Sequence, residues 1–250
     1  MKTPSETKAD EDIWRYMDLP KFISLLRTDA LWFARVDTFE DKWEGISRHI
    51  PFPSSKEGHP AYLNFVKTHC RWRKSLNKRV FINCWTLEQE SIPMWKNYAS
   101  FDSGIAVQST VGRVTHSVKM SGFNLQEGGL VEYYDALSEA DFDYSSAINF
   151  SWPKAFELHL RKRSCFSFER EWRALIIGNE KNRKKGIEVP VVVNDLIERV
   201  LVSPLATASF LKTVTVVSEK FGLNVSPKKS QLARSRPPES STVGQSAQSD

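Results

Sequence analysis

Apolar residues in this chain come in short runs separated by polar and turn-forming residues, and this pattern limits the fold more than any other feature. No run approaches the ~18 consecutive apolar residues that a membrane-spanning helix requires. Runs rich in β-branched and aromatic residues are typical of strands, and here they alternate with segments of helical periodicity. The 15 Phe, 8 Trp and 6 Tyr supply enough apolar surface for a packed core. The sequence therefore predicts a folded domain built from both strands and helices.

The two ends of the chain differ from its middle in composition. Residues 1–12 are polar and acidic, and residues 226–250 are rich in Ser, Pro and Gln with almost no apolar side chains. Neither end can bury enough apolar surface to offset the entropy that ordering would cost. We therefore expect a disordered acidic N-terminus over 1–12, one α+β domain over 13–225, and a disordered polar, basic tail over 226–250.

Charge and cysteine content narrow the class of protein. The 35 Lys and Arg exceed the 30 Asp and Glu by 5, which permits contact with a polyanion without requiring it. The start of the chain does not resemble a secretory signal peptide. Its 3 cysteines are widely spaced and do not form a disulfide framework. These features predict a protein of the reducing cytoplasm, with no membrane contact.

The periodicity predicts an α+β fold, a single compact domain of mixed sheet with peripheral helices. Asp18 is placed to cap the first helix, and Gly222 to end the last. The expected strands cover 13–16, 31–36, 80–86, 104–108, 130–134, 171–177, 187–193 and 200–202. The expected helices cover 19–28, 60–78, 111–118, 152–163 and 206–221, with a short one after Ser91 that carries Met94, Trp95 and Tyr98.

The stretch from Phe166 to Ile177 carries the most informative polar pattern. If it is a strand, alternation places Glu169, Glu171 and Arg173 on one face within about 14 Å. Neighbouring carboxylates shift each other's pKa values apart, which suits acid–base chemistry or contact with a ribose hydroxyl. The other interpretation is a solvated strand face whose charges form ion pairs with neighbouring strands.

Aromatic residues flank polar ones at two further places. In Ile13–Tyr16, Arg15 lies between two aromatic residues, where a guanidinium can bind a phosphate or carboxylate with two hydrogen bonds. After the hydroxyl of Thr86, Trp95 and Tyr98 offer rings that can stack on a planar ligand. The structural alternatives are an edge strand with an ion-paired arginine, and aromatic residues packed in the core.

Several common chemistries lack their motifs in this sequence. No G-x-S-x-G, G-x-G-x-x-G or G-x-x-x-x-G-K-[ST] pattern is present, which argues against serine hydrolases, Rossmann folds and P-loop NTPases. His69–Cys70 has no partners at metal-ligand spacing, so we expect no metal. A metal-dependent nuclease would require Asp41, Glu44 and Glu169 to converge in space.

Short motifs follow one another in a fixed order after Leu19: Leu31–Phe33, Phe39–Gly45, Cys84–Thr86, Met94–Lys96, Gly104–Val107, Glu169–Arg173 and Val202–Pro204. Together they resemble a widespread bacterial family, a domain of unknown function whose members sometimes occur in phage-defence settings. The resemblance covers about residues 13–225 and implies no established activity.

A more distant resemblance, to ADP-ribosyltransferases, rests on three elements in order: Arg15 near the start, the strand that ends at Thr86, and the Glu-x-Glu of Glu169 and Glu171. The opening strand, helix and Leu-Trp-Phe strand are also similar to the start of several such transferases. The middle element departs from the Ser-Thr-Ser pattern of these enzymes, since it reads Asn-Cys-Trp-Thr here.

This second resemblance implies NAD as a substrate and a reaction at the nicotinamide–ribose bond, which passes through an oxocarbenium-like state. It implies two catalytic residues, Glu171 at the ribose 2′-hydroxyl and Glu169 at the acceptor. A guanidinium would hold a phosphate or the ribose, and an aromatic ring would stack on nicotinamide. The cofactor-binding residues that it implies are Arg15, Tyr16, Thr86, Trp95 and Tyr98.

We therefore expect a cytoplasmic bacterial enzyme, an ADP-ribosyltransferase-like protein or NAD glycohydrolase in a defence or toxin–antitoxin context. Its partners would be a macromolecular acceptor, protein or nucleic acid, and a cognate regulator protein. The alternative is a non-catalytic interaction module or nucleic-acid-associated defence module. In that case the basic segments 71–79, 161–163 and 181–185 would contact an anionic partner.

Overall fold

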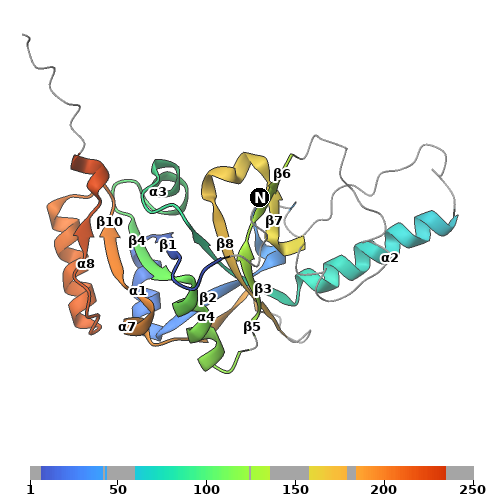
Figure 1. Cartoon of the computed structure of the whole chain (residues 1–250), viewed down its shortest axis with the longest axis horizontal. Helices are drawn as coiled ribbons and strands as arrows, with labels where there is room; N and C mark the ends of the chain where they lie inside the picture. The colour runs from blue at the N-terminus through green and yellow to red at the C-terminus, as the bar shows by residue number, and fades with distance from the viewer. Residues whose placement is uncertain are drawn as a thin grey trace, which may run out of the picture.

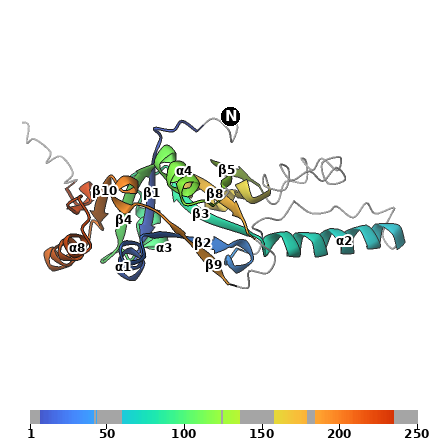
Figure 2. The ribbon, with the colours of Figure 1, turned by 90° about the horizontal axis from the view of Figure 1, so that it is seen from below.

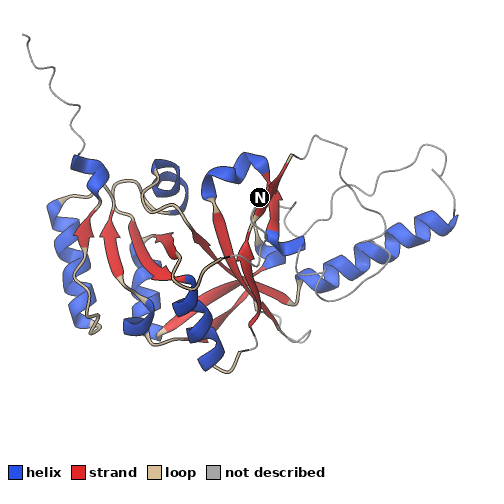
Figure 3. Ribbon diagram, viewed as in Figure 1, coloured by secondary structure: helices blue, strands red, loops and turns tan. Residues whose placement is uncertain are grey.

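Strands and helices interleave along the chain around one large mixed sheet (Figure 1). The computed structural model describes residues 7–41, 43, 60–123, 125–135, 158–178 and 184–234. Within these residues the α+β class, the mixed sheet and the peripheral helices predicted from the sequence are confirmed (Figure 3). No helix of the described segments combines the length and the apolar character needed to cross a membrane.

The strands of the described residues have the following bounds: β1 (Asp12–Met17), β2 (Ala30–Arg35), β3 (Val80–Thr86), β4 (Ile105–Thr110), β5 (Leu125–Leu130), β6 (Glu132–Tyr134), β7 (Arg161–Arg163), β8 (Glu171–Ile177), β9 (Gly186–Pro190), β10 (Arg199–Val202) and β11 (Lys228–Lys229). The α-helices are α1 (Leu19–Thr28), α2 (Pro60–Asn77), α3 (Ile92–Tyr98), α4 (Val111–Met120), α7 (Val193–Leu196) and α8 (Ala208–Lys220). Short 3₁₀ helices are η2 (Val36–Thr38), η3 (Leu158–Leu160), η4 (Ser164–Glu169) and η5 (Gln231–Arg234).

β3 is the strand on which the large sheet branches. One edge of β3 pairs antiparallel with β8 along its whole length, and β8 pairs in turn with β5. The other edge is shared, since β1 pairs at the end of β3 near Thr86 and β2 pairs at the other end near Phe81. From β1 the sheet continues through β4 and β10 to β11, and from β2 it continues to β9. Residues far apart in the sequence therefore meet around β3.

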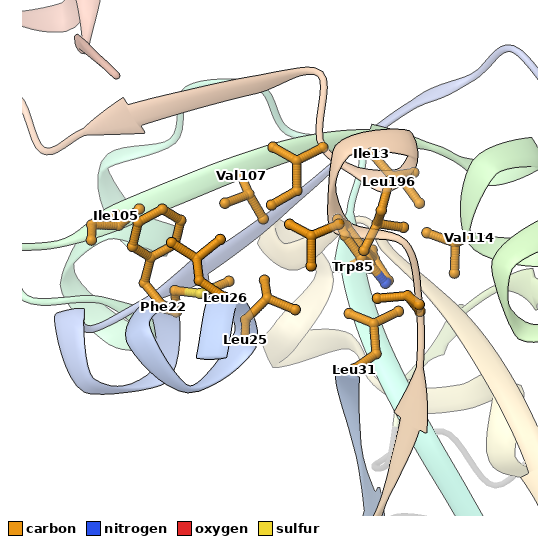
Figure 4. Packing of buried hydrophobic residues seen from close by; sticks show 14 of the residues in the cluster. Ile13, Phe22, Leu25, Leu26, Leu31, Trp85, Ile105, Val107, Val114 and Leu196 are labelled. Atoms are coloured by element: carbon orange, nitrogen blue, oxygen red, sulfur yellow. The ribbon is translucent and has the colours of Figure 1, made fainter. Parts of the chain in front are cut away.

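The largest apolar cluster covers one face of this sheet. Alternate residues of each strand point to that face, among them Ile13 of β1, Trp85 of β3 and Val107 of β4. In Figure 4 side chains of α1, such as Phe22 and Leu26, gather with these strand residues. Helices α4, α7 and α8 contribute to the same cluster.

The opposite face of the sheet carries two smaller apolar clusters and the polar residues considered below. One cluster includes Ile82 of β3 and Leu175 of β8. The other joins Trp14 and Tyr16 of β1 to Trp95 of α3. The short helix α3 and the C-terminal end of α2, at Leu76, therefore pack against this face.

The structure contradicts one of the two predictions on either side of residue 165 and confirms the other. The helix expected over 152–163 is instead η3 followed by β7, which pairs in parallel with β6. The strand expected over 171–177 is confirmed as β8. Strand alternation does not extend back to Phe166, because η4 precedes β8 and Arg170 adopts a left-handed conformation with φ of 39°. Residues 152–157, the first part of the expected helix, lie outside the described residues.

The C-terminal segment contributes more to the fold than its composition indicates. Lys228 and Lys229 form β11, which pairs in parallel with Leu201 and Val202 of β10. Ser230 follows, is buried, and donates its backbone N–H to the carbonyl of Val202 at 2.9 Å. The folded unit therefore continues past the expected boundary at residue 225. Residues 235–250 lie outside the described residues, as do residues 1–6 at the other end.

Helix α1 illustrates how local sequence sets an element. Asp18 Oδ1 accepts a hydrogen bond from the backbone N–H of Lys21 at 2.8 Å, as its position before the helix predicted. Phe22, Leu25 and Leu26 form the buried stripe, and Asp29 ends the helix in a left-handed conformation with φ of 46°. The capping residues and the apolar stripe thus both indicate the observed bounds of α1.

We predict that Asp18→Ala lowers the free energy of unfolding by about 1 kcal/mol, because the first turn loses its side-chain acceptor. Lys21→Ala is the control, since it removes only the exposed ion pair of 3.3 Å and keeps the backbone N–H. It should cost less than about 0.5 kcal/mol. Urea denaturation measures both, and equal losses in the two variants would contradict the capping role.

Candidate active site

The pairing of β3 with β8 brings two predicted site residues together. Thr86 lies directly opposite Glu171, and Cys84 lies opposite Arg173. Residues that face each other across a pair of strands project to the same side of the sheet. Thr86, Glu171 and Arg173 therefore share the face that lies opposite the main apolar cluster.

Four charged side chains meet at the start of β8, and we call them the carboxylate cluster: Lys162, Glu169, Glu171 and Arg173. Lys162 Nζ lies 2.5 Å from Glu169 Oε2 and 3.4 Å from Glu171 Oε2. Arg173 Nη2 donates to Glu171 Oε2 at 2.9 Å. Two anions and two cations thus balance within one network.

The carboxylate cluster is almost closed to solvent. The exposed fractions are 3% for Glu169, 5% for Glu171, 8% for Lys162 and 1% for Arg173. Buried charges of this kind persist only when each is paired and hydrogen-bonded. The alternative interpretation, a solvated strand face with ion pairs, is therefore wrong about solvent exposure, because these side chains are buried. The ion pairs that it expected are present.

The pKa values of the two carboxylates move in opposite directions. Burial raises the pKa of Glu171, but Arg173 and Lys162 outweigh it and lower that pKa to about 2. Burial and the neighbouring charge of Glu171 raise the pKa of Glu169 above its ordinary value. A pair split in this way holds one permanent anion beside a stronger base, the arrangement from which acid–base roles are assigned.

Two tyrosines connect the carboxylate cluster to its surroundings. The Tyr98 hydroxyl, on α3, donates to Glu169 Oε1. The Tyr133 hydroxyl accepts the backbone N–H of Glu171 at 2.9 Å. Burial raises the pKa of both phenols, so they stay protonated. Tyr98 is 40% exposed, which makes its ring the part of this site that faces solvent.

Thr86 orders the backbone beside the carboxylate pair. Its hydroxyl donates to the carbonyl of Glu169 at 2.5 Å and accepts the backbone N–H of Glu88 at 3.0 Å. The backbone N–H of Leu87 donates to the carbonyl of Arg170 at 3.0 Å. Thr86 therefore holds the turn between η4 and β8 in place, and both of its hydrogen-bonding directions are used.

The structure does not bring Arg15 to the carboxylate cluster. Trp14 lies opposite Thr86, so Trp14 is on the cluster's face of the sheet and Arg15, one residue later, is on the other. The Arg15 guanidinium lies 3.5 Å from the carbonyl of Trp32. Tyr16 is on the cluster's face, but its hydroxyl donates to the carbonyl of Gln89 at 2.9 Å.

The two aromatic residues expected to stack on nicotinamide have different environments. Trp95 is fully buried and packs edge-on against Tyr16, with ring centroids 4.8 Å apart. No ligand can stack on its ring without displacing that contact. Of the two, only Tyr98 offers an accessible ring beside the carboxylates.

Lys162 is the member of the cluster that sequence reasoning missed. It falls in the basic run 161–163, which was expected to end a helix, and a basic helix end gives no signal of a buried lysine. As a strand, β7 alternates, so Lys162 points inward while Arg161 pairs with Glu132 and Arg163 with Asp41. This run is therefore ion-paired rather than a free basic patch.

The metal-dependent nuclease gains no support from the structure. Asp41 binds Arg163 through both carboxylate oxygens, at 3.0 and 3.2 Å. Glu44 lies outside the described residues. Among the side chains that the structure describes, no group of three or more His, Cys, Asp or Glu is arranged to hold a metal ion.

Comparison with known proteins finds remote structural likenesses. No family model and no curated protein matches the chain. DarT of Thermus sp. 2.9 in complex with NAD+ is 12% identical over 91% of this chain and 98% of that chain, with a TM-score of 0.42. DarT of the same source in complex with ADP-ribosylated ssDNA is 11% identical over 91% and 96%, with a TM-score of 0.40. The resemblance to an uncharacterised bacterial family therefore stays a prediction.

His159 is fully buried and contacts the carboxylate cluster through its backbone. Its carbonyl accepts a hydrogen bond from Arg173 Nη1 at 2.7 Å. Neither ring nitrogen of His159 has a hydrogen-bond partner among the described residues. Burial and the charge of Arg173 lower the pKa of His159 to about 3. The ring is therefore neutral in the folded protein, whereas it gains a proton near pH 6.5 when unfolded.

We predict that His159 makes stability fall with acid. Between about pH 4 and 6 the unfolded chain binds one more proton at this residue, so the free energy of unfolding falls by about 1.4 kcal/mol per pH unit. In His159→Leu the slope of stability against pH should be smaller by that amount, measured by urea denaturation. The exposed His116 provides the control variant His116→Leu, which should keep the wild-type slope. An unchanged slope in His159→Leu would refute the assignment.

Proposed function

We propose that the chain is an ADP-ribosyltransferase-like enzyme or NAD glycohydrolase that acts at the nicotinamide–ribose bond of NAD. The observation that supports this proposal is the pair Glu169 and Glu171, two adjacent carboxylates whose pKa values shift in opposite directions. Cleavage of a glycosidic bond uses one carboxylate to stabilise positive charge and another to handle a proton. An exposed ring, that of Tyr98, lies beside the same pair.

In this proposal Glu171 is the charge-stabilising carboxylate. When the bond between nicotinamide and ribose breaks, its electron pair goes to the nicotinamide nitrogen and the ribose carbon becomes oxocarbenium-like. A permanently ionised Glu171 hydrogen-bonded to the ribose 2′-hydroxyl stabilises that charge in a site with little water. Arg173 and Thr86 keep the carboxylate and its strand oriented.

Glu169 is the base of the proposed reaction. The acceptor, water or a macromolecule, forms the new bond to the ribose carbon and gives up a proton, which passes to a Glu169 oxygen. A raised pKa makes this carboxylate a stronger base than an ordinary glutamate. Tyr98 orients it through its hydroxyl, while its ring would stack on nicotinamide.

The remaining roles follow from the placement of the predicted residues. Arg15 is on the far face of the sheet and Trp95 is buried, so we no longer propose either as a contact to NAD. The DarT structures named above contain NAD+ and ADP-ribosylated ssDNA. For this chain we propose NAD as the substrate and leave its macromolecular acceptor as protein or nucleic acid. We retain the bacterial cytoplasm, a defence or toxin–antitoxin context and a regulator protein as parts of the same proposal.

We predict that Glu171→Gln lowers the rate of nicotinamide release from NAD at least about 100-fold, because the charge opposite the oxocarbenium state is lost. Liquid chromatography of NAD incubated with purified protein measures the release. Glu188→Gln, an exposed glutamate of β9, is the matched control and should leave the rate unchanged. Equal release by wild type and Glu171→Gln would remove Glu171 from the mechanism.

A second variant guards against misfolding, because Glu171→Gln leaves the buried Arg173 without its carboxylate. Tyr98→Phe keeps the ring and removes only the hydrogen bond to Glu169. It should retain NAD binding by calorimetry and reduce nicotinamide release about tenfold, the effect of one catalytic hydrogen bond. No release by the folded wild-type protein, with or without cell lysate as a source of acceptor, would overturn the proposed function.

One observation favours the alternative, a nucleic-acid-associated module. Lys67, Arg71 and Lys74 of α2 and Lys78 just after it are exposed and recur at a spacing that places them on one face of the helix. In Figures 1 and 2 this helix extends away from the sheet. A row of cations on a projecting helix suits the phosphate backbone of a nucleic acid.

We predict that the triple variant Lys67→Glu/Arg71→Glu/Lys74→Glu weakens binding to single-stranded DNA, if that alternative holds. The slope of log affinity against log salt should decrease by about 2, since three phosphate contacts are lost. The control is Arg27→Glu/Lys212→Glu/Lys220→Glu, which makes the same change of charge on exposed residues of α1 and α8. Fluorescence anisotropy measures the DNA affinity of both variants. Equal losses of affinity would contradict a specific role of α2 and would indicate only non-specific charge attraction.

A further inference from the structure

The carboxylate of Glu90, in the loop between β3 and α3, is surrounded by donors from the C-terminal segment. The Ser230 hydroxyl donates to Glu90 Oε2. The backbone N–H of Gln231 donates to Oε1 at 3.0 Å, and that of Leu232 donates to Oε2 at 3.2 Å. We call residues 228–232 the clasp. Glu90 thus accepts the first N–H groups of η5 as a helix cap does, although it is distant in sequence.

The clasp is fixed to the sheet independently of Glu90. β11, at its start, pairs with β10, and the backbone N–H of Ser230 continues that pairing to the carbonyl of Val202. Ser230 is 1% exposed. The donors that face Glu90 are therefore held in position by contacts that do not involve Glu90.

The loop that carries Glu90 leads directly to Tyr98. Its neighbour Ser91 precedes the first residue of α3, and the Ser91 carbonyl accepts the backbone N–H of Trp95 at 3.0 Å. α3 is short, from Ile92 to Tyr98, and its last residue donates to Glu169. Glu90 therefore lies near one end of a seven-residue helix, and the residue at its other end, Tyr98, contacts Glu169.

The loop that carries Glu90 also makes hydrogen bonds that do not involve the clasp. The hydroxyl of Tyr16 donates to the carbonyl of Gln89, and Arg170 Nη1 donates to Glu88 Oε1 at 2.8 Å. The Tyr16 hydroxyl also accepts the backbone N–H of Ser91 at 3.3 Å, so these contacts hold the loop on both sides of Glu90. Glu90 lies between these contacts, two residues before α3, and its carboxylate adds the connection from this loop to the C-terminal segment.

We propose that Glu90, through the clasp, is a positioning residue that sets where α3 presents Tyr98 to Glu169. The C-terminal segment up to Leu232 is then a part of the working site rather than a solvated tail. This inference rests on the proposed function only for its catalytic consequence. The coupling of the clasp to α3 is a property of the fold and stands apart from the reaction.

The coupling is tested by hydrogen exchange on the full-length protein. Glu90→Gln removes the charge that the three donors share, and it should speed amide exchange in α3 at least about tenfold. Exchange in β8, which the clasp does not touch, should stay as in wild type. Ser230→Ala is a milder variant with the same expected direction, in case Glu90→Gln folds poorly. Glu219→Gln, an exposed glutamate of α8, is the matched control.

The catalytic consequence is tested by a double-mutant cycle on nicotinamide release. If Glu90 acts through Tyr98, Glu90→Gln should lower nicotinamide release in the wild-type background. It should cause no further loss in Tyr98→Ala, which lacks both the hydroxyl and the ring. Unchanged α3 exchange in both Glu90→Gln and Ser230→Ala, or additive losses in the cycle, would overturn the proposal. If wild-type protein releases no nicotinamide, the proposed function fails, while exchange in α3 still decides the coupling.

Discussion

A carboxylate buried in a sheet is tolerated only if cations and hydrogen-bond donors surround it, and this requirement organises the centre of the molecule. Glu171 receives Arg173 from its own strand and Lys162 from β7. Lys162 in turn binds Glu169 at the end of η4, and Tyr98 of α3 completes the contacts of Glu169. The contacts of these two carboxylates therefore bring three short elements, β7, η4 and α3, to the start of β8.

The branching of the sheet at β3 explains where this charge lies. β8 occupies one edge of β3, while β1 and β2 divide the other, so Thr86 and Glu171 face each other where β1 also arrives. Helices α1, α4, α7 and α8 gather on the opposite face with the main apolar cluster. This leaves the cluster's face to short elements, which can carry polar groups without breaking a continuous core.

The pKa values of Glu169 and Glu171 shift in opposite directions, and this difference gives the two carboxylates different chemical properties. Glu171, a buried anion beside two cations, stays ionised. Glu169 becomes the better base because burial, and then the neighbouring charge of Glu171, raise its pKa. A site of this kind suits a reaction that develops positive charge on a sugar and then transfers a proton, as cleavage of NAD does. The clasp at Glu90 extends the same site to the C-terminal segment through α3.

The sequence by itself determined the strands and helices whose signal is local: the cap at Asp18, the apolar stripe of α1, and the alternation along β3 and β8. It also marked Glu169 and Glu171 as a pair, since their spacing is visible in the chain. Only the tertiary structure decided which face each strand presents, because that depends on pairing between distant segments. Arg15 therefore lies on the face away from the carboxylates, Trp95 lies in the core, and Lys162 lies in the site. The polar segment after residue 225 joined the fold for the same reason, since β10 and Glu90 supply partners that composition cannot show.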